Sequence, residues 1–233
     1  MIMNYNMNSM DLKQFTHKTS DYKLPYLAVE EDGNSRQYKT PDGKKYHSVT
    51  TVTGWKKSEF FKRWRQKNPV ESARVLRRGN DLHLLIEKYL DNEENFLENV
   101  LPNEYILFEQ ALPKLNKIDN VVCQEAALWS DLMELAGRVD CIAEYNGKLS
   151  VIDFKGSTRL KRAEDIDNYF MQATAYAIMW QERTGQKIDN IVILMTCEDG
   201  NVEVFESNPR LHTRDLFECI KDYKIQRELD MSG

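Results

Sequence analysis

The sequence has few cysteines and no long apolar run. Its four cysteines, Cys123, Cys141, Cys197 and Cys219, are far apart and form no CxxC pair. They therefore predict free, buried thiols in a reducing compartment and give no basis for a zinc or iron–sulfur site. No apolar stretch approaches the roughly 20 residues needed to cross a bilayer, and the N-terminus lacks an apolar signal core. We expect a cytoplasmic protein without a membrane partner.

The chain also lacks an overall excess of positive charge. Its formal net charge is -5 over 233 residues, which argues against a protein that coats nucleic acid by bulk charge. The distribution is uneven, however, because residues 55–80 contain nine basic and two acidic side chains. We therefore expect a local basic surface on an otherwise acidic protein.

The first half of the chain is expected to form an arm, a β-meander and helices. Residues 1–23 are rich in Asn and Met and contain no arginine, which disfavours a mitochondrial presequence and indicates a flexible N-terminal arm. From residue 24, DG and PDG turn signals separate short strand-like runs, and Ser48 or Thr50 can cap the helix that follows. Helical periodicity predicts further helices at residues 56–67, 69–90 and 104–117.

After Asp119 the hydrophobic period changes from 3.6 to two residues. The pattern predicts three antiparallel strands, a helix, two more strands and a last helix, within residues 120–155, 167–184, 189–207 and 209–229. This order predicts the α/β (α+β) fold class, in which a central mixed β-sheet is flanked by helices. With 41% hydrophobic residues, the chain suits a single domain over residues 24–233.

The segment GRVDCIAEYNGKLSVIDFKGS, residues 137–157, predicts a hairpin in which two carboxylates face each other. Its Asn146-Gly147 pair is the strongest short-range signal for a two-residue type I′ turn. Counting outward from that turn pairs Asp140 with Asp153. Like charges at directly opposed strand positions destabilise a sheet. A shared proton or a divalent cation would remove the repulsion.

The surroundings of this pair favour a cation. Oxygen ligands without clustered Cys or His suit Mg²⁺, with Mn²⁺ as a substitute, better than zinc. Lys155 follows Asp153 by two residues on the same strand face, so its ammonium can hold an attacking water or help its deprotonation, and can offset phosphate charge. The alternative is an exposed strand end at which the same Asp, Lys and Arg side chains form a cross-strand charge cluster.

Four ordered motifs resemble those of a known family. Gly137-Arg138-Val139-Asp140 and Asp153-Phe154-Lys155 resemble the core signature of the PD-(D/E)xK nuclease superfamily, with Val139 at the nominal proline. Arg77 to Glu87 and Gln172 to Tyr176 resemble the R-G-x-x-x-H-x-x-x-E and Q-x-x-x-Y helices of its RecB-like branch. The chain is similar to the phage-encoded and mitochondrial exonucleases of that branch. The resemblance implies a restriction-endonuclease-like catalytic core over residues 119–233, preceded by the meander and basic helices of residues 24–118.

The resemblance also implies an activity and a set of site residues. It implies a Mg²⁺-dependent deoxyribonuclease, an exonuclease that acts on single-stranded DNA or DNA ends in replication, repair or recombination. The implied catalytic residues are Asp140, Asp153, Lys155 and Gln172, and the implied metal ligands are Asp140, Asp153, the Phe154 carbonyl, His83 and Glu125. For His83 and Glu125 the alternatives are a histidine bonded to a backbone carbonyl and a surface carboxylate.

A third set of residues is expected to contact DNA. Candidates for phosphate contacts and strand guidance are Lys62, Arg63, Arg77, Arg78, Lys161, Arg162 and Tyr176. Nearby aromatic side chains can stack on bases, although Phe60 and Trp64, four residues apart, are expected mainly to pack. With only Cys219 near the C-terminus, no iron–sulfur cluster of the kind found in some relatives is expected.

Two other functions stay open at this stage. One is a flap-processing endonuclease of the same fold, and the other is a non-catalytic nucleic-acid-binding module. The composition favours a protein of the bacterial cytosol. If the gene is phage-encoded, this would be the cytosol of the bacterial host.

Overall fold

A mixed β-sheet forms the centre of the molecule. The computed structural model describes residues 10–18, 25–32 and 35–232. Within these residues the sheet has eight strands in the order β1-β2-β3-β5-β6-β7-β8, and β4 also pairs with β5. The strands are β1 (Ala28–Asp32), β2 (Ser35–Lys39), β3 (Lys45–Ser48), β4 (Ile118–Ser130), β5 (Leu135–Tyr145), β6 (Lys148–Ser157), β7 (Asn190–Cys197) and β8 (Val202–Ser207).

Both parallel and antiparallel pairs occur in the sheet. The predicted meander is present as antiparallel β1, β2 and β3, and β3 then runs parallel to the start of β5. Strand β5 is antiparallel to β4 and β6, whereas β6 and β7 are parallel because helix α5 (Asp167–Thr184) connects them. The expected α/β class with a helix-flanked mixed sheet is thus confirmed.

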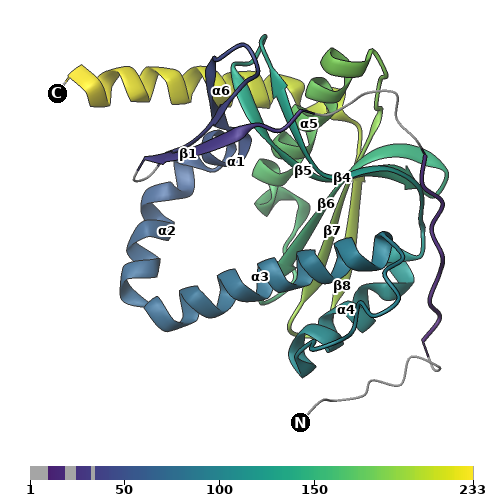
Figure 1. Ribbon diagram of the computed structural model, residues 1–233. Helices are drawn as coiled ribbons and strands as arrows, with labels where there is room; N and C mark the ends of the chain where they lie inside the picture. The colour runs from purple at the N-terminus through teal and green to yellow at the C-terminus, as the bar shows by residue number, and fades with distance from the viewer. Residues whose placement is uncertain (1–9, 19–24, 33–34, 233) are drawn as a thin grey trace.

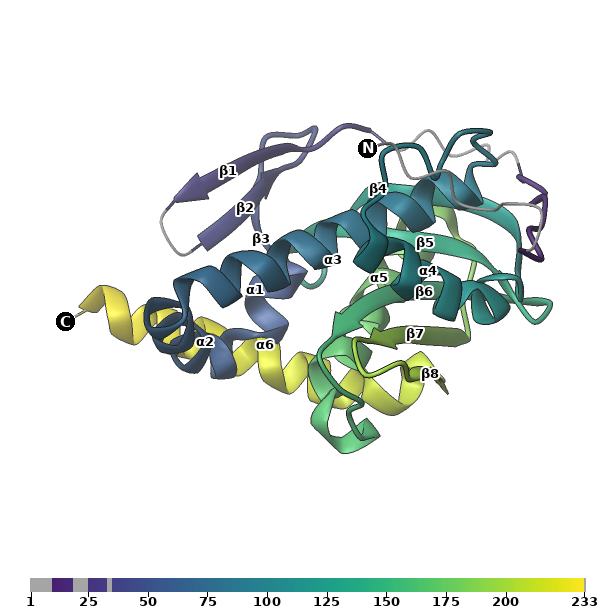
Figure 2. The ribbon, with the colours of Figure 1, turned by 90° about the horizontal axis from the view of Figure 1, so that it is seen from below.

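Helices cover both faces of the sheet (Figures 1 and 2). Helices α3 (Pro69–Leu90) and α4 (Pro102–Leu115) pack on one face, while α1 (Val49–Thr53), α5 and α6 (Pro209–Ser232) pack on the other. Each face of the sheet has its own hydrophobic core, and successive side chains of β6 enter the two cores in turn. Val151 lies in the core on the α5 side, and Ile152 lies in the core on the α3 side. Two-sided burial also explains why β7 is apolar without a break from Ile191 to Met195.

Local signals explain where the helices begin. Ser48 caps α1 by accepting the Thr51 N–H at 3.0 Å. Helix α3 starts at Pro69 as predicted. Helix α4 starts at Pro102, two residues before the predicted position, because the Glu104 side chain accepts the Leu101 N–H at 3.0 Å and so fixes the first turn.

Helix α2 (Trp55–Lys67) differs from its expectation in one respect. It links α1 to α3 at a distance from the sheet (Figure 1), and it buries no side chain. Phe60 is 62% exposed and Trp64 is only partly covered. The expectation that these two aromatic residues mainly pack is wrong for Phe60, whereas the larger part of the Trp64 surface is covered.

Part of the expected flexible arm is docked on the α3 side of the molecule. Phe15 is buried and meets Tyr89 edge to face, with ring centroids 4.9 Å apart. The Lys13 N–H donates to the Tyr89 hydroxyl at 2.8 Å, and the Lys18 N–H donates to the Val121 carbonyl at 2.8 Å. These contacts give residues 10–18 a fixed place, while most of the remaining arm lies outside the described residues.

None of the helices in the described parts of the chain is both long and apolar enough to span a bilayer. The compartment stays a prediction.

Candidate active site

The predicted hairpin places the site at the end of the β5–β6 ladder. Asn146 and Gly147 have φ angles of +50° and +76°, as a type I′ turn requires. The register pairs Tyr145 with Lys148 and Ile142 with Val151, which confirms the prediction, but backbone pairing stops at Cys141 and Ile152. The next residues are Asp140 and Asp153, so the two carboxylates lie where the strands part.

Each of these carboxylates has a separate partner. The Phe154 N–H donates to Asp140 Oδ2 at 2.9 Å. Asp153 is 2% exposed, and its two oxygens lie 2.8 and 2.7 Å from Lys155 Nζ. Burial raises the pKa of Asp153 to about 6, although Lys155 acts to lower it. Burial opposes the charge on Lys155, yet Asp153 and Asp140 together raise its pKa, so the ammonium form is favoured.

Asp140 also belongs to a cluster of three potential metal ligands. His83 from α3, Glu125 from β4 and Asp140 each offer an atom, and these atoms lie within 4.8 Å of one another. His83 Nδ1 is 3.6 Å from Asp140 Oδ2. Burial, with added repulsion from Asp140 and Glu87, raises the pKa of Glu125 to about 7.

The backbone of Glu125 is strained. Its φ of +47° lies in the left-handed region in the middle of β4, which costs a non-glycine residue about 1–2 kcal/mol. The neighbours Gln124 and Ala126 pair with Cys141 and Val139, so Glu125 stands across from Asp140. Strain at a carboxylate that meets another carboxylate is typical of a functional site.

The donor set of this cluster suits a divalent cation. Two carboxylates and one imidazole offer mainly hard oxygen ligands, which Mg²⁺ and Mn²⁺ accept. Burial is the main cause of the raised pKa of Glu125, and repulsion from Asp140 and Glu87 adds to it; a bound cation would offset that repulsion. The structure therefore separates the implied ligands into a cluster of His83, Glu125 and Asp140 and an adjacent ion pair of Asp153 with Lys155.

The cluster and Lys155 line one groove of about 610 Å³, whereas Asp153, which is 2% exposed, is not part of its lining. Helix α3 forms one wall and the ends of β5 and β6 form the floor. Arg36 and Tyr38 of β2 form part of the opposite side, together with Ser48 and Thr50 at the start of α1. These four residues were not among the predicted site residues, because the long-range pairing of β3 with β5 is what brings the meander here.

Helix α5 supplies the implied Q-x-x-x-Y pair to the same groove. Gln172 and Tyr176 are buried, line the groove and are hydrogen-bonded to each other. The Tyr176 hydroxyl lies against Gly137, where a Cβ would approach it to 2.6 Å. Burial, with Asp140 among the contributing charges, raises the pKa of Tyr176. Tyr176 thus forms a rigid wall beside Asp140.

Tyr169, also on α5, is a site residue that the sequence reasoning missed. Lys155 Nζ and Lys161 Nζ each lie 5.1 Å from its ring centroid, and Lys161 also donates to its hydroxyl at 3.0 Å. Its spacing from Gln172 and Tyr176, three and seven residues, places it on the same helix face and was an available signal.

Most of the other expected DNA contacts lie elsewhere. Helix α3 turns the Arg78 side chain towards the sheet, where it lies next to Gly156, is 4% exposed and forms an ion pair with Glu198. Arg78 is therefore a structural cation and not a DNA contact. Arg77 is exposed outside the groove and pairs with Asp81 at 3.2 Å. Lys62, Arg63 and Arg162 are not part of the groove lining, whereas Lys161 reaches the site through Tyr169.

Comparisons with known proteins agree with this arrangement. The family described as "PD-(D/E)XK nuclease superfamily" matches residues 44–207. Mitochondrial genome maintenance exonuclease 1 of Homo sapiens is 32% identical over 130 residues, which cover 49% of this chain and 37% of that protein. The protein of that name from Mus musculus is 29% identical over 113 residues, or 45% and 33% of the two chains. The matched part therefore spans about a third of each relative.

Proposed function

The chain belongs to the PD-(D/E)XK nuclease superfamily, and on that premise we propose that it is a Mg²⁺-dependent DNA exonuclease. The proposed substrate is single-stranded DNA or DNA with free ends, and the proposed setting is replication, repair or recombination. The observation that carries the proposal is that the His83, Glu125 and Asp140 cluster lines one groove together with Lys155, which is paired with the buried Asp153. The name of these relatives, mitochondrial genome maintenance exonuclease 1, supports an exonuclease that serves genome maintenance.

His83, Glu125 and Asp140 would hold the divalent cation, next to Asp153. A bound cation supplies Lewis-acid stabilisation of the charge that develops at phosphorus during hydrolysis. The Phe154 N–H holds Asp140 by a hydrogen bond of 2.9 Å, so this carboxylate is oriented before any ligand binds.

Lys155 acts in this proposal as a cation and not as a general base. Both Asp153 and Asp140 favour its protonated form, and Asp153 oxygens at 2.7 and 2.8 Å fix its direction. A fixed ammonium beside the cluster can donate to the attacking water or to a phosphate oxygen and so stabilise the transition state. Tyr169 covers the lysine from the α5 side and limits its movement.

The proposal is tested with labelled DNA. Purified protein is incubated with 5′- and 3′-labelled linear single strands, a blunt duplex and a closed circular single strand, with Mg²⁺, Mn²⁺ or EDTA. We expect metal-dependent loss of linear strands, an intact circle, and no cleavage by Lys155→Ala, which should still bind DNA in Ca²⁺. Lys187→Ala, which removes an exposed lysine paired with Asp189 outside the groove, is the matched control and should cleave normally.

The same substrates separate the other functions. Cleavage of the closed circle would indicate an endonuclease of the same fold. Absence of cleavage on every substrate, with binding preserved, would contradict the enzymatic proposal and favour a binding module.

A further inference from the structure

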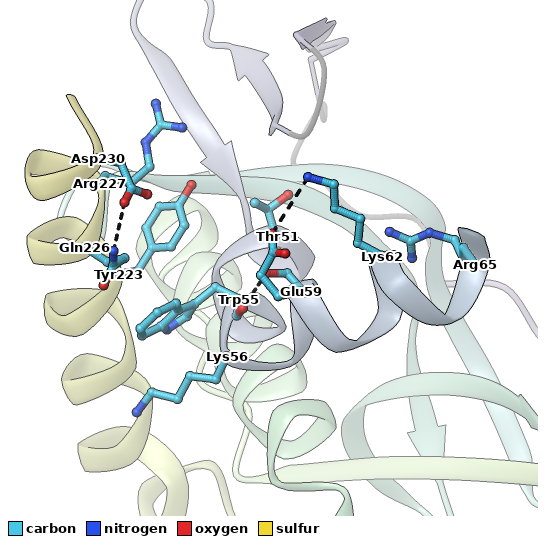
Figure 3. A pocket seen from close by; sticks show the side chains of 11 residues that line it. Thr51, Trp55, Lys56, Glu59, Lys62, Arg65, Tyr223, Gln226, Arg227 and Asp230 are labelled. Atoms are coloured by element: carbon cyan, nitrogen blue, oxygen red, sulfur yellow. Dashed lines mark hydrogen bonds and ion pairs between the residues drawn. The ribbon is translucent and has the colours of Figure 1, made fainter. Parts of the chain in front are cut away.

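A second hollow lies between α2 and the C-terminal half of α6 (Figure 3). It has a volume of about 590 Å³, and we refer to it as the α2–α6 pocket. Lys62 and Arg65 line it from α2, and Arg227 lines it from α6. Trp55 and Tyr223 form an aromatic part of the wall, and Thr51 of α1 lies at the inner end.

Positive charge converges on this pocket from two distant parts of the sequence. Four basic and two acidic side chains line it. The acidic ones compensate part of this charge, because Glu59 pairs with Lys62 at 3.9 Å, whereas Asp230, which accepts from Gln226 at 2.8 Å, has no cation of the described residues at ion-pair distance. Within the described parts of the chain, Arg65 and Arg227 have no carboxylate at ion-pair distance. An anionic ligand would relieve the repulsion among these cations.

The aromatic wall adds a second kind of contact. The rings of Trp55 and Tyr223 lie 6.5 Å apart at 64°, and Lys56, which is neutralised by Asp222 at 2.9 Å, lies 5.6 Å from the Trp55 ring. Aromatic side chains beside cations suit a polyanion that also carries flat bases, which is the composition of single-strand binding sites.

The short helix α1 contributes residues to both this pocket and the active groove. Ser48 and Thr50 line the groove, whereas Thr51 lines the pocket. The Ser48 hydroxyl donates to Thr51 Oγ1 at 2.7 Å, so the two walls are joined directly. A single strand that leaves the groove beside Thr50 would therefore meet the pocket beside Thr51 of the same short helix.

We propose that the α2–α6 pocket binds the backbone phosphates of a single-stranded segment of the substrate outside the active groove. This inference rests on the proposed function, since it assigns the strand in the groove and the strand in the pocket to one molecule. A duplex is stiff over about 150 base pairs and cannot turn around one short helix, whereas a single strand can. Arg65, Lys62 and Arg227 are the proposed phosphate contacts.

The test measures binding without cleavage. Fluorescence anisotropy in Ca²⁺ gives the Kd of labelled single-stranded and duplex oligonucleotides between 50 and 200 mM salt. Each phosphate contact to a single strand contributes about 0.7 to the slope of log K against log salt. We expect Arg65→Ala with Arg227→Ala to lower that slope by about 1.4, so that the loss of affinity over this salt range becomes about sevenfold smaller.

Matched variants make the result specific. The double variant Arg210→Ala with Arg214→Ala removes two exposed positive charges of α6. Neither residue lines the pocket or the groove, so the salt slope of this variant should equal that of the wild type. Lys62→Gln with Arg65→Gln is a second test, because α2 buries no side chain and folding should be unaffected. All variants are checked by thermal unfolding.

The outcomes distinguish this inference from the proposed function. An unchanged slope in both pocket variants, or an equal loss in the control, overturns the pocket assignment even if the enzyme cleaves DNA. A loss confined to duplex DNA overturns the single-strand assignment. A lowered single-strand slope in a protein that cleaves nothing supports the pocket and contradicts only the nuclease proposal.

Discussion

The Phe154 amide donates to Asp140 Oδ2 at 2.9 Å across the point where β5 and β6 separate. The hydrogen bond replaces the backbone pairing of β5 with β6, which ends at Cys141, the residue after Asp140. It holds a candidate metal ligand in place and keeps the strands in register. Asp140 therefore has a structural and a chemical role, and different substitutions should separate them.

Asp140→Asn should lose metal binding but keep the fold. The Asn carbonyl oxygen can still accept the Phe154 N–H, whereas Asp140→Ala leaves that amide without its acceptor, at a cost of about 1–3 kcal/mol. In thermal unfolding, the Asp140→Asn variant should therefore have a Tm near that of the wild type, and the Asp140→Ala variant a clearly lower Tm. Calorimetric titration with Mn²⁺ should show weak or no binding for both. Wild-type Mn²⁺ affinity in the Asn variant would remove Asp140 from the ligand set.

Glu125→Gly should stabilise the protein and impair its chemistry. Glycine adopts the φ of +47° without the cost of about 1–2 kcal/mol that Glu bears. Glu125→Gln is the matched control, because it removes the charge and keeps the strain. In urea unfolding, the Glu125→Gly variant should be more stable than the Glu125→Gln variant by about 1 kcal/mol. Both substitutions should weaken Mn²⁺ binding. If Gly and Gln unfold at the same urea concentration, the backbone carries no strain.

The metal-free protein should lose stability as the pH rises from about 4.5 to about 7. Burial raises the pKa of Asp153 to about 6 and that of Glu125 to about 7. In this range the folded state binds more protons than the unfolded state, so the free energy of unfolding falls with pH. The total effect is on the order of a few kcal/mol.

Thermal unfolding in EDTA across this pH range checks the effect, and Glu125→Gln should flatten the upper part of the curve. Mn²⁺ at pH 7 should restore stability, because it binds the folded state. A stability that rises steadily from pH 4.5 to 7 in EDTA would show that neither carboxyl group is destabilised by burial.

Tyr169→Ala should lower kcat, whereas Tyr169→Phe should not. The ring lies 5.1 Å from Lys155 Nζ, and a cation–ring contact contributes about 0.5–2 kcal/mol, or about 2- to 30-fold in rate. Phe keeps this ring and loses only the hydrogen bond from Lys161. Single-turnover cleavage measures the rate, and DNA binding in Ca²⁺ should change little in either variant. Equal rates in Ala and wild type would leave Tyr169 without a positioning role.

Local signals explain what could be predicted from the sequence. The Asn146-Gly147 turn fixed the register that brings Asp140 towards Asp153, and Pro69 marked the start of α3. These features depend on residues that are neighbours in the chain.

Features that depend on distant contacts were missed. Arg36 and Tyr38 reach the groove only because β3 pairs with β5. Arg78 was expected to be a surface cation, because its ion-pair partner Glu198 lies 120 residues away in the sequence and no neighbouring residue indicates this contact. The split between the ligand cluster and the Asp153–Lys155 pair likewise depends on where the ladder ends, which hydrophobic alternation does not reveal.

Gly137→Ala tests how tightly α5 is fitted against the metal-ligand strand. A Cβ at position 137 would lie 2.6 Å from the Tyr176 hydroxyl oxygen and 3.1 Å from the ring, which is closer than side chains tolerate. We expect a loss of about 1–3 kcal/mol, the usual cost of overpacking a core. Tyr176→Phe removes the closest atom, so the double variant should recover much of this loss, and the coupling should be at least about 0.5 kcal/mol.

Urea unfolding of the wild type, the two single variants and the double variant measures the coupling, while Mn²⁺ binding reports on Asp140, three residues along β5. If relief of the clash restores both stability and Mn²⁺ affinity, the Gly137–Tyr176 contact positions the ligand strand. Additive effects would mean that the two residues act independently, and Gly137 would then be needed for a reason other than the approach of Tyr176.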